Sequence, residues 1–400
     1  MSRRLLLALA VAVAGVALVG AAALLGAGGG DDEPRAERSR AAVRAPDLRD
    51  CRRVGGDLAR ACYTRQFLAA VRGTDDPRPT IAAIAGSAWK EGPALMADCH
   101  GIMHTVGRTY AREAGVTLAT LMDRLPQGND PGCTAGFAHG MVTAVAPDID
   151  PTRPGEAARL CGGARTRYQE YSCIHGFGHA FMRIYGDEVA PALELCRALG
   201  ERAAADCAQG AYHDYWFALA GTDDATPPAD VVRDPRELCG AAPARFVRPC
   251  WYRAWVENRP ATFAVAAPED LDALCHQLTG LQREGCITGA AVIGPVDPAD
   301  QLRLCARLAT ATDASACVRG TKVQNLLDRP ARELVALVAG CARFGRATRD
   351  ACYRWLGKAT AVLTDGRFAR EGCPRLRGAV ARRACAEGAA TMDAALETFS

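Results

Sequence analysis

Almost no stretch of this sequence alternates apolar and polar residues as a strand does, and clusters of β-branched residues are few. Apolar residues lie instead in short segments with helical character. Residues 191–199 are typical of a first helix, 200–206 of a turn and 207–220 of a second helix, and the same order returns at 271–278, 280–285 and from 286 onward. The pattern predicts an all-α protein made of helix–turn–helix units.

Eighteen cysteines mark out these units. The second cysteine of each close pair recurs roughly every 31–43 residues, which is the period of a two-helix repeat. We therefore predict an α-solenoid of about nine two-helix repeats, each stapled by one disulfide from the end of its first helix to the start of its second. The predicted disulfides are Cys51–Cys62, Cys99–Cys133, Cys161–Cys173, Cys196–Cys207, Cys239–Cys250, Cys275–Cys286, Cys305–Cys317, Cys341–Cys352 and Cys373–Cys385.

The period and the placement of the cysteines, from about Leu48 to the C-terminus, resemble those of disulfide-stapled helical-repeat proteins. These proteins are relatives of the tetratricopeptide solenoids, and the resemblance implies a tetratricopeptide-like architecture. The tetratricopeptide consensus itself is absent from this sequence. Solenoids of this kind mostly bind other proteins along a concave face, which makes a protein partner there one expectation.

The N-terminus predicts export. Arg3 and Arg4 lie in a short tip at residues 1–4, and an apolar run at residues 5–27 follows. This run is about 23 residues long, enough for a transmembrane signal-anchor and long for a cleaved signal peptide, although both alternatives stay open. The positive tip should stay in the cytoplasm, and a flexible linker at 28–47 then leads to an extracytoplasmic domain at 48–400. The high, even cysteine count is typical of a disulfide framework outside the cytoplasm.

The charge of the chain excludes one class of partner. The formal net charge is only +3, and the basic residues are spread along the sequence. A protein that binds nucleic acid needs a concentrated basic face, so we expect no nucleic-acid partner.

Six of the seven histidines lie between Asp98 and Trp216 and share one frame. With Asp98, Cys133, Cys173 and Cys207 as position zero, a glycine stands at plus three and a histidine at plus six in all four segments. A second histidine stands at plus two in the first and third segments. The six histidines are His100, His104, His139, His175, His179 and His213.

The frame predicts that these histidines are buried. In other units position plus six is Leu68, Val256, Val292 and Val323, then Lys358 and Thr391 near the C-terminal end, which indicates a position that faces the apolar core or the inner surface of the array. Burying several imidazoles costs stability unless a partner satisfies them, and a shared metal ion does so economically. A polar hydrogen-bonded network, a substrate pocket or chance are the alternatives. The glycine at plus three persists in units without histidine, so we expect it to let second helices pack closely.

The metal ligands are predicted to form two triplets. Histidines four residues apart lie on one face of a helix, so His100 with His104 and His175 with His179 can each share an ion. His139 and His213 follow one unit later and complete the triplets. An open solenoid would keep the triplets apart, whereas a tightly coiled one would bring them together as a dinuclear centre. Six histidines arranged in this way resemble the type 3 copper centre of tyrosinases and hemocyanins. A dimetal site in a helical-repeat array also resembles deoxyhypusine hydroxylase, but the His-Glu pairs of that family are absent here.

Imidazole ligands alone suit copper or zinc, with iron as a further candidate. Few carboxylates stand near the frame, which argues against iron, and Asp98, Glu170 and Asp214 are the candidate exceptions. Aromatic residues near the histidines either favour copper or only fill the core: Tyr110, Tyr212, Tyr215 and Trp216. Cysteine ligands are not expected, since pairing uses every thiol.

The sequence therefore predicts a membrane-anchored extracytoplasmic metalloprotein, either an oxidoreductase or a metal-handling protein. The alternative is a protein-interaction scaffold with a structural histidine cluster, and a zinc hydrolase is a third hypothesis. Motifs for covalent haem, metalloproteases, serine hydrolases and nucleotide binding are absent, so whether it is an enzyme stays open. His-bearing repeats are expected at 98–220 and His-poor repeats at 221–400, with His276 on the surface.

Overall fold

A computed structural model describes residues 46–126, 132–220, 232–257, 265–295, 297–323 and 331–393. All regular structure in these ranges is helical, which confirms the predicted all-α class. The described residues belong to one compact unit. The predicted tip at 1–4, the apolar segment at 5–27 and most of the linker at 28–47 lie outside them. Across the described ranges, no helix combines the length and the apolar character that a membrane span requires.

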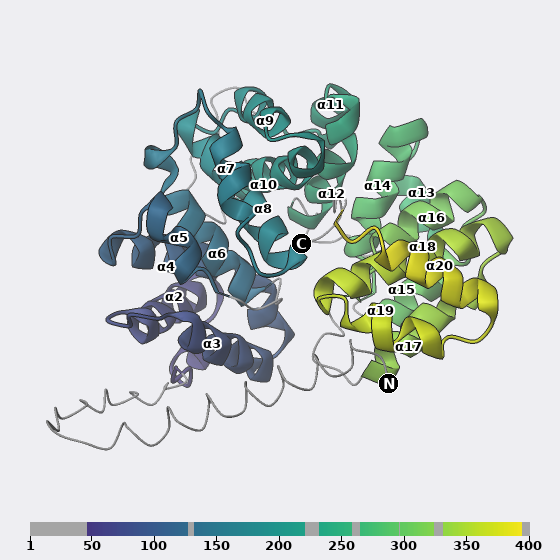
Figure 1. Cartoon of the computed structure of the whole chain (residues 1–400), viewed down its shortest axis with the longest axis horizontal. Coiled ribbons are helices and arrows are strands. Elements are labelled where there is room, and N and C mark those ends of the chain that lie inside the picture. The colour runs from purple at the N-terminus through teal and green to yellow at the C-terminus, as the bar shows by residue number, and fades with distance from the viewer. Residues whose placement is uncertain are drawn as a thin grey trace, which may run out of the picture. The chain divides into compact units, whose positions relative to one another are not determined.

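The chain runs through successive units in which a short first helix precedes a second helix, usually longer (Figure 1). The first helices are α3 (Arg78–Glu91), α5 (Leu118–Arg124), α7 (Gly155–Cys161), α9 (Val189–Ala198), α11 (Pro235–Gly240), α13 (Pro268–Leu274), α15 (Pro298–Cys305), α17 (Ala331–Ala339) and α19 (Arg367–Glu371). The second helices are α2 (Gly56–Val71), α4 (Pro93–Glu113), α6 (Cys133–Ala144), α8 (Arg167–Ile184), α10 (Glu201–Ala220), α12 (Val247–Glu257), α14 (Gly280–Val292), α16 (Ala311–Arg319), α18 (Arg346–Leu363) and α20 (Ala379–Ala389). Short 3-10 turns supplement them at Cys51–Arg53, Ala146–Asp148, Ala244–Phe246, Gly340–Arg343 and Cys373–Arg375.

Several helices begin where the sequence supplies a cap. The side chains of Asp234 and Asp297 accept hydrogen bonds from the first backbone N–H groups of α11 and α15, and each aspartate is followed by a proline at the first helical position. Thr166 and Thr310 cap α8 and α16 in the same way. These side chains satisfy N–H groups that have no partner inside the helix, which fixes where each helix starts.

The predicted turns are too long. Residues 201–206 belong to α10 and residues 280–285 to α14, so the predictions of turns at 200–206 and 280–285 are wrong for nearly all of these positions. The run Glu-Arg-Ala-Ala-Ala-Asp at 201–206 consists mostly of good helix formers, and the turn before it is made at Gly200, whose φ is +93°. The second cysteine of a unit therefore lies inside its helix in every unit but one, the exception being Cys133 at the start of α6.

Nine disulfides join the pairs expected from the spacing, and no described cysteine is free. Eight of them connect the first part of a unit to its own second helix. Cys99–Cys133 is different, because it joins α4 to α6, the second helices of two neighbouring units. This bridge closes a longer loop of the chain, because its cysteines are 34 residues apart whereas those of the other eight pairs are 11 or 12 apart.

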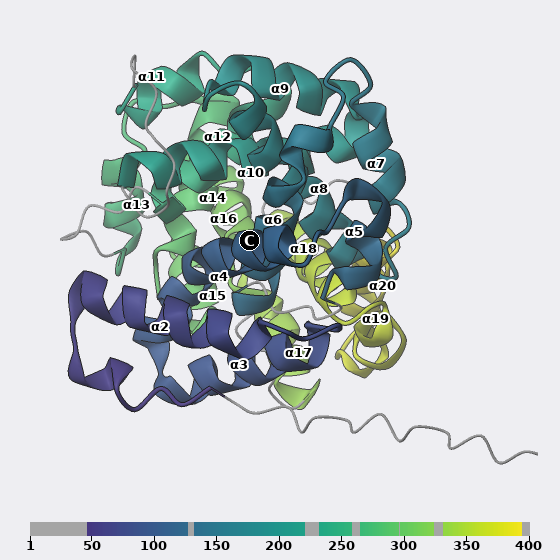
Figure 2. The ribbon, with the colours of Figure 1, turned by 90° about the vertical axis from the view of Figure 1, so that its left-hand side faces the viewer.

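Second helices pack in chain order, from α2 against α4 to α18 against α20 (Figures 1 and 2). Glycines make this packing close, as the sequence predicts. A Cβ on Gly289 of α14 would lie 2.4 Å from the carbonyl oxygen of Trp251 in α12, and one on Gly388 of α20 would lie 1.9 Å from that of Arg354 in α18. The helix backbones touch at these positions, so only glycine fits.

The substitution Gly289→Ala is expected to destabilise the protein by about 1–3 kcal/mol, because the new methyl group must push α12 and α14 apart. The matched control is Gly86→Ala in α3, where nothing lies within 4 Å of the added Cβ. This exposed change should instead stabilise the helix by up to about 1 kcal/mol. Urea denaturation measures both, and equal effects at the two sites would contradict the packing role.

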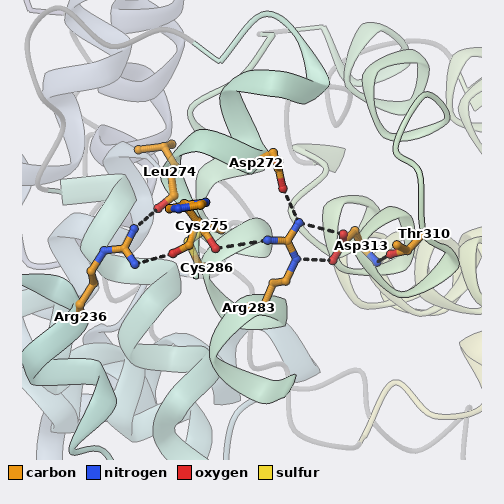
Figure 3. A network of polar contacts seen from close by, with 9 residues as sticks. Arg236, Asp272, Leu274, Cys275, Arg283, Cys286, Thr310 and Asp313 are labelled. Atoms are coloured by element: carbon orange, nitrogen blue, oxygen red, sulfur yellow. Dashed lines mark hydrogen bonds and ion pairs between the residues drawn. A yellow bond between two sulfur atoms is a disulfide. The ribbon is translucent and has the colours of Figure 1, made fainter. Parts of the chain in front are cut away.

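Arginines link the His-poor units to one another (Figure 3). Arg236 donates to the backbone oxygens of Leu274 and His276, just beyond the last turn of α13. Arg283 of α14 donates to Cys275 O in the same region and also pairs with Asp272 and Asp313. A guanidinium at a helix C-terminus satisfies carbonyls that have no partner within the helix and complements the helix dipole. These contacts fix how one unit is set against the next.

A candidate metal centre of six histidines

The six framed histidines lie together in one cluster at the centre of α4, α6, α8 and α10. Centroid distances between contacting imidazole rings run from 4.5 Å for His139 and His175 to 5.7 Å for His104 and His213. Five of the six side chains are buried, and His100 is partly exposed. The structure therefore confirms that the framed histidines are buried, as the apolar residues at this position in other units predict.

Framed glycines bring the histidines this close. A Cβ on Gly136 of α6 would lie 2.2 Å from the carbonyl oxygen of His100 in α4, and one on Gly210 of α10 would lie 1.9 Å from that of His175 in α8. Gly140 stands in the same relation to His104, at 2.1 Å. The four helices therefore form two tightly packed pairs, α4 with α6 and α8 with α10. Between the pairs, Gly176 of α8 meets only the side chain of Val142 in α6, at 3.0 Å.

The cluster has an approximate twofold symmetry that relates the two helix pairs. Exchanging the segments that start at Asp98 and Cys133 for those at Cys173 and Cys207 exchanges His100 with His175, His104 with His179 and His139 with His213. The His100–His213 contact at 5.0 Å then maps onto the His139–His175 contact at 4.5 Å. The contact between His104 and His179, at 4.7 Å, maps onto itself. The sequence duplication is thus also a duplication in space.

The two predicted triplets do not form separate sites. Candidate ligand atoms of His100, His104 and His139 lie within 4.8 Å of one another, which is the expected first set. The second compact group, however, consists of His139, His175 and His179, with His139 in the place expected for His213. The structure thus corresponds to the coiled alternative, in which the triplets face each other, and the buried cluster could hold metal ions.

Neighbouring polar groups orient several of the rings. His179 Nδ1 lies 3.1 Å from Asp214 Oδ1, and Arg183 donates to the same carboxylate oxygen at 3.2 Å. Ser172 Oγ and His139 Nε2 are hydrogen-bonded at 3.1 Å. Each of these hydrogen bonds engages one ring nitrogen and fixes the orientation of the ring, as the outer groups of metal-bound histidines commonly do.

Two pairs of imidazole nitrogens are hydrogen-bonded to each other, and two further nitrogens have no hydrogen-bond partner among the described residues. His100 Nε2 lies 3.1 Å from His104 Nε2, and His175 Nε2 lies 3.0 Å from His213 Nδ1. The Nδ1 atoms of His139 and His175 are buried and have no hydrogen-bond partner among the described residues. Leaving a buried polar atom unsatisfied costs about 1–3 kcal/mol, so such atoms call for an explanation.

Three of the buried imidazoles strongly favour the neutral form. Burial lowers the pKa of His139 well below its ordinary value, and the neighbouring His175 lowers this pKa further. Burial likewise lowers the pKa values of His175 and His213, and the positive charge of Arg253 adds to the effect. A neutral imidazole keeps a lone pair available, which is the form that binds a metal ion.

A buried network next to His175 was not predicted from the sequence. The Tyr171 ring lies 5.7 Å from the His175 ring, and its hydroxyl donates to Gln209 Oε1 at 2.9 Å. Arg253 of α12 donates to the same oxygen at 3.3 Å. One sequence signal could have found Arg253, because it stands three residues after Cys250, where most other units carry glycine.

A cavity of about 440 Å³ adjoins the cluster on one side. Ser172, Thr134 and Ala138 form part of its wall, and Arg78, Asp123 and Gln169 also line it. Ser172 is the link to the cluster, since its hydroxyl is hydrogen-bonded to His139. A small molecule in this cavity would thus be separated from His139 by one side chain.

The aromatic residues near the histidines pack in the core of the protein or at its edge. Tyr212 and Trp216 are buried, and the hydroxyls of Tyr110 and Tyr215 donate to the backbone oxygens of Thr74 and Val232. Each is thus accounted for by packing or by a local hydrogen bond. The remaining histidine, His276, is exposed in the His-poor part of the chain, as expected.

The candidate carboxylates differ in their positions. Asp98 is exposed, and Glu170 forms ion pairs with Arg202 and Arg167. Only Asp214 touches the cluster, and it does so through His179 Nδ1. The described part of the chain therefore presents imidazoles as the inner donors, with one carboxylate behind them.

Comparisons with known proteins found no family model, curated protein or solved structure that matches the chain. The described fold is all-helical and rich in disulfides, consistent with a helical repeat, and its function must be inferred from the cluster itself.

Proposed function

We propose that this protein is an extracytoplasmic metalloprotein that binds transition-metal ions in the six-histidine cluster. Its nine disulfides indicate an oxidising compartment, as is typical of exported proteins. The apolar N-terminal segment at 5–27 would tether it to the membrane, with the helical repeats outside the cytoplasm.

One observation carries this proposal: six imidazoles from four helices converge in a buried cluster, and the Nδ1 atoms of His139 and His175 have no hydrogen-bond partner in the part of the chain that the structure describes. Desolvated imidazoles are costly, and repulsion between protonated rings would make them more so. Bound metal ions would satisfy the nitrogens of several rings at once. Core packing alone does not require imidazoles at equivalent positions of both helix pairs.

Copper and zinc fit the donors best. Both bind neutral imidazole, and both are commonly held by three histidines. Non-haem iron usually takes two histidines and a carboxylate, whereas the carboxylate of Asp214 lies behind His179 and not beside the other donors. Cysteine ligation is excluded, because every thiol is in a disulfide.

The site suits an oxidoreductase or a metal-handling protein. The cavity bounded by Ser172 would give a small molecule access to the side of the cluster at His139, which supports chemistry at the metal. Tyr171 and Arg253 lie on the His175 side and supply a hydroxyl and a positive charge there. A carrier would use the same histidines and would release its ion when the rings become protonated.

The substitution His179→Ala is expected to remove bound metal while leaving the disulfide-stapled fold intact, because nine cross-links hold the helices in place. Metal content by mass spectrometry and helicity by circular dichroism are measured together. His276→Ala, which lies outside the cluster, is the control and should keep the wild-type metal content. A His179 variant that loses stability, when the wild-type protein holds only background metal, would support the scaffold alternative with a polar histidine core.

A further inference from the structure

We propose that the cavity beside His139 binds a small organic carboxylate, whose charged end lies at the exposed side of the cavity and whose apolar end lies against Ser172. The inference deepens the proposed function and rests on it, because the bound molecule would be a substrate or ligand for chemistry at the metal cluster. The cavity has a volume of about 440 Å³, which is in the range of sites that hold small molecules.

The inner wall of the cavity is apolar apart from hydroxyl groups. Ala135 and Ala138 of α6 are buried there, and their small side chains leave space that larger ones would fill. Leu125, just after α5, adds a larger apolar side chain. Ser172 of α8 separates this wall from the cluster, because its hydroxyl is hydrogen-bonded to His139 Nε2 at 3.1 Å. The inner wall therefore suits the apolar body of a ligand, with its tip one side chain away from His139.

The charged residues lie on the exposed side of the cavity. Arg165, in the loop before α8, is exposed, and Arg78, at the start of α3, is partly buried. Asp76 orients the guanidinium of Arg78, whose Nε and Nη2 donate to the two carboxylate oxygens at 2.6 and 2.9 Å. Within the described ranges the third nitrogen, Nη1, makes no hydrogen bond, so it can donate to a ligand. Guanidinium groups bind carboxylates well because their donors match the carboxylate geometry.

The balance of charge at the cavity favours an anion over a cation. Two guanidiniums line it together with one carboxylate, that of the exposed Asp123. Three helices of 12 to 18 residues, α3, α6 and α8, begin at the cavity, and their first turns line it through Arg78, Thr134 and Gln169. Two helices of seven residues, α5 and α7, end beside it. Since a helix carries partial positive charge at its N-terminus, the three beginnings favour a negatively charged group.

Three probes with the same ring test the charge that the cavity selects. Benzoate, benzamide and benzylammonium are negative, neutral and positive at one end, and titration calorimetry of the full chain measures the affinity of each. Benzoate is expected to bind at least about 10-fold more tightly than either of the others, because hydrogen bonds between charged groups are the stronger ones. Equal affinity for benzamide, or tighter binding of benzylammonium, would overturn the inference.

Point variants test whether benzoate binds in this cavity. Arg78→Gln should weaken binding by about 10-fold, whereas Asp123→Asn should strengthen it, since a like charge is removed. Ala164→Phe adds a ring to the cavity wall and should block binding. The matched control is Arg49→Gln, because Arg49 donates to Asp47 at the same spacing but outside the cavity, and it should leave the affinity unchanged. Circular dichroism checks the fold, and unchanged affinity in either Arg78→Gln or Ala164→Phe would overturn the inference.

Paramagnetic cobalt(II) tests the orientation of the ligand and separates this inference from the proposed function. With cobalt in the cluster, the para proton of bound benzoate should broaden more than the ortho protons in the NMR spectrum, because it lies at the end next to Ser172. Stronger broadening of the ortho protons would overturn the proposed orientation. A chain that selects benzoate but holds no cobalt, zinc or copper would remove the proposed function and leave an anion site. A chain that holds metal without selecting benzoate would overturn only this inference.

Discussion

The metal-free protein is expected to lose about 4 kcal/mol of stability for each pH unit below pH 6.5. Folding lowers the pKa values of His139, His175 and His213, whereas the unfolded chain keeps the ordinary value near 6.5. Below that pH the unfolded state takes up protons that the folded state does not. Each such group contributes a slope of about 1.4 kcal/mol per pH unit, and three groups together give the expected value. Above pH 6.5 both states are unprotonated at these rings and the effect disappears.

Urea denaturation between pH 7.5 and 5.5, after removal of metal, should show a total loss of about 4 kcal/mol, because the slope reaches its full value only once the pH has fallen well below 6.5. The window lies above the range in which most carboxylates titrate, so the histidines dominate it. His213→Gln should reduce the slope by about a third, since one of the three groups is lost. His276→Ala should leave it unchanged. A flat profile across this window would show that the folded cluster accepts protons, which contradicts the neutral, desolvated state of the rings.

The second large effect is expected from the buried ion pair at the base of α8 and α10. The guanidinium of Arg167 donates to the carboxylate of Asp206, and their side chains are only 2% and 1% exposed. Asp206→Ala is expected to destabilise the protein by about 3–5 kcal/mol, because it leaves a buried positive charge without its main partner. Glu170, which lies 3.7 Å from Arg167, can compensate only in part.

Two further variants make this result specific. Arg167→Met/Asp206→Leu removes both charges and should recover most of the stability, since an apolar pair of similar size can replace a buried ion pair. Glu194→Ala breaks the exposed pair with Arg197 and should change stability by less than about 1 kcal/mol. If Asp206→Ala and Glu194→Ala gave similar small effects, Arg167 would have to be solvated in the folded state.

The sequence predicts the framework of this fold well because cysteine and glycine positions report directly on packing. The close pairs, such as Cys275 and Cys286, give the unit length, and the recurring glycine marks the backbone contact seen at Gly289 and Gly210. The boundaries within each unit are less well predicted. Gly200 makes the turn alone, and the helix formers after it allow α10 to begin earlier than expected.

The histidine register also predicts burial, but not how the rings meet. Which imidazoles share a site depends on the rotation of α6 relative to α8, and the sequence contains no pattern that fixes that rotation. His139 thus lies close to His175 and His179 as well as to His100 and His104 of its own helix pair. Asp214 adjoins His213 in the sequence and yet bonds to His179, because successive residues of a helix point in different directions.

Ser172 and Arg253, which lie next to the cluster, stand at sequence positions that do not indicate a role in a metal site. Ser172 immediately precedes a disulfide cysteine, and Arg253 belongs to the unit that follows the four units with framed histidines. Neither residue type suggests a metal site by itself. Their roles depend on contacts with His139 and Gln209 that only the folded chain creates.

The most direct test of the account is the metal content of the full chain, exported to an oxidising compartment and purified without a histidine tag. The account predicts two copper or zinc ions per chain, either as isolated or after reconstitution, and a lower metal content in the His179→Ala/His213→Ala variant. Copper at this ratio would direct the search toward oxidase activity, and zinc toward hydrolytic, structural or carrier roles. A folded protein that holds no metal, even after reconstitution, would contradict the account.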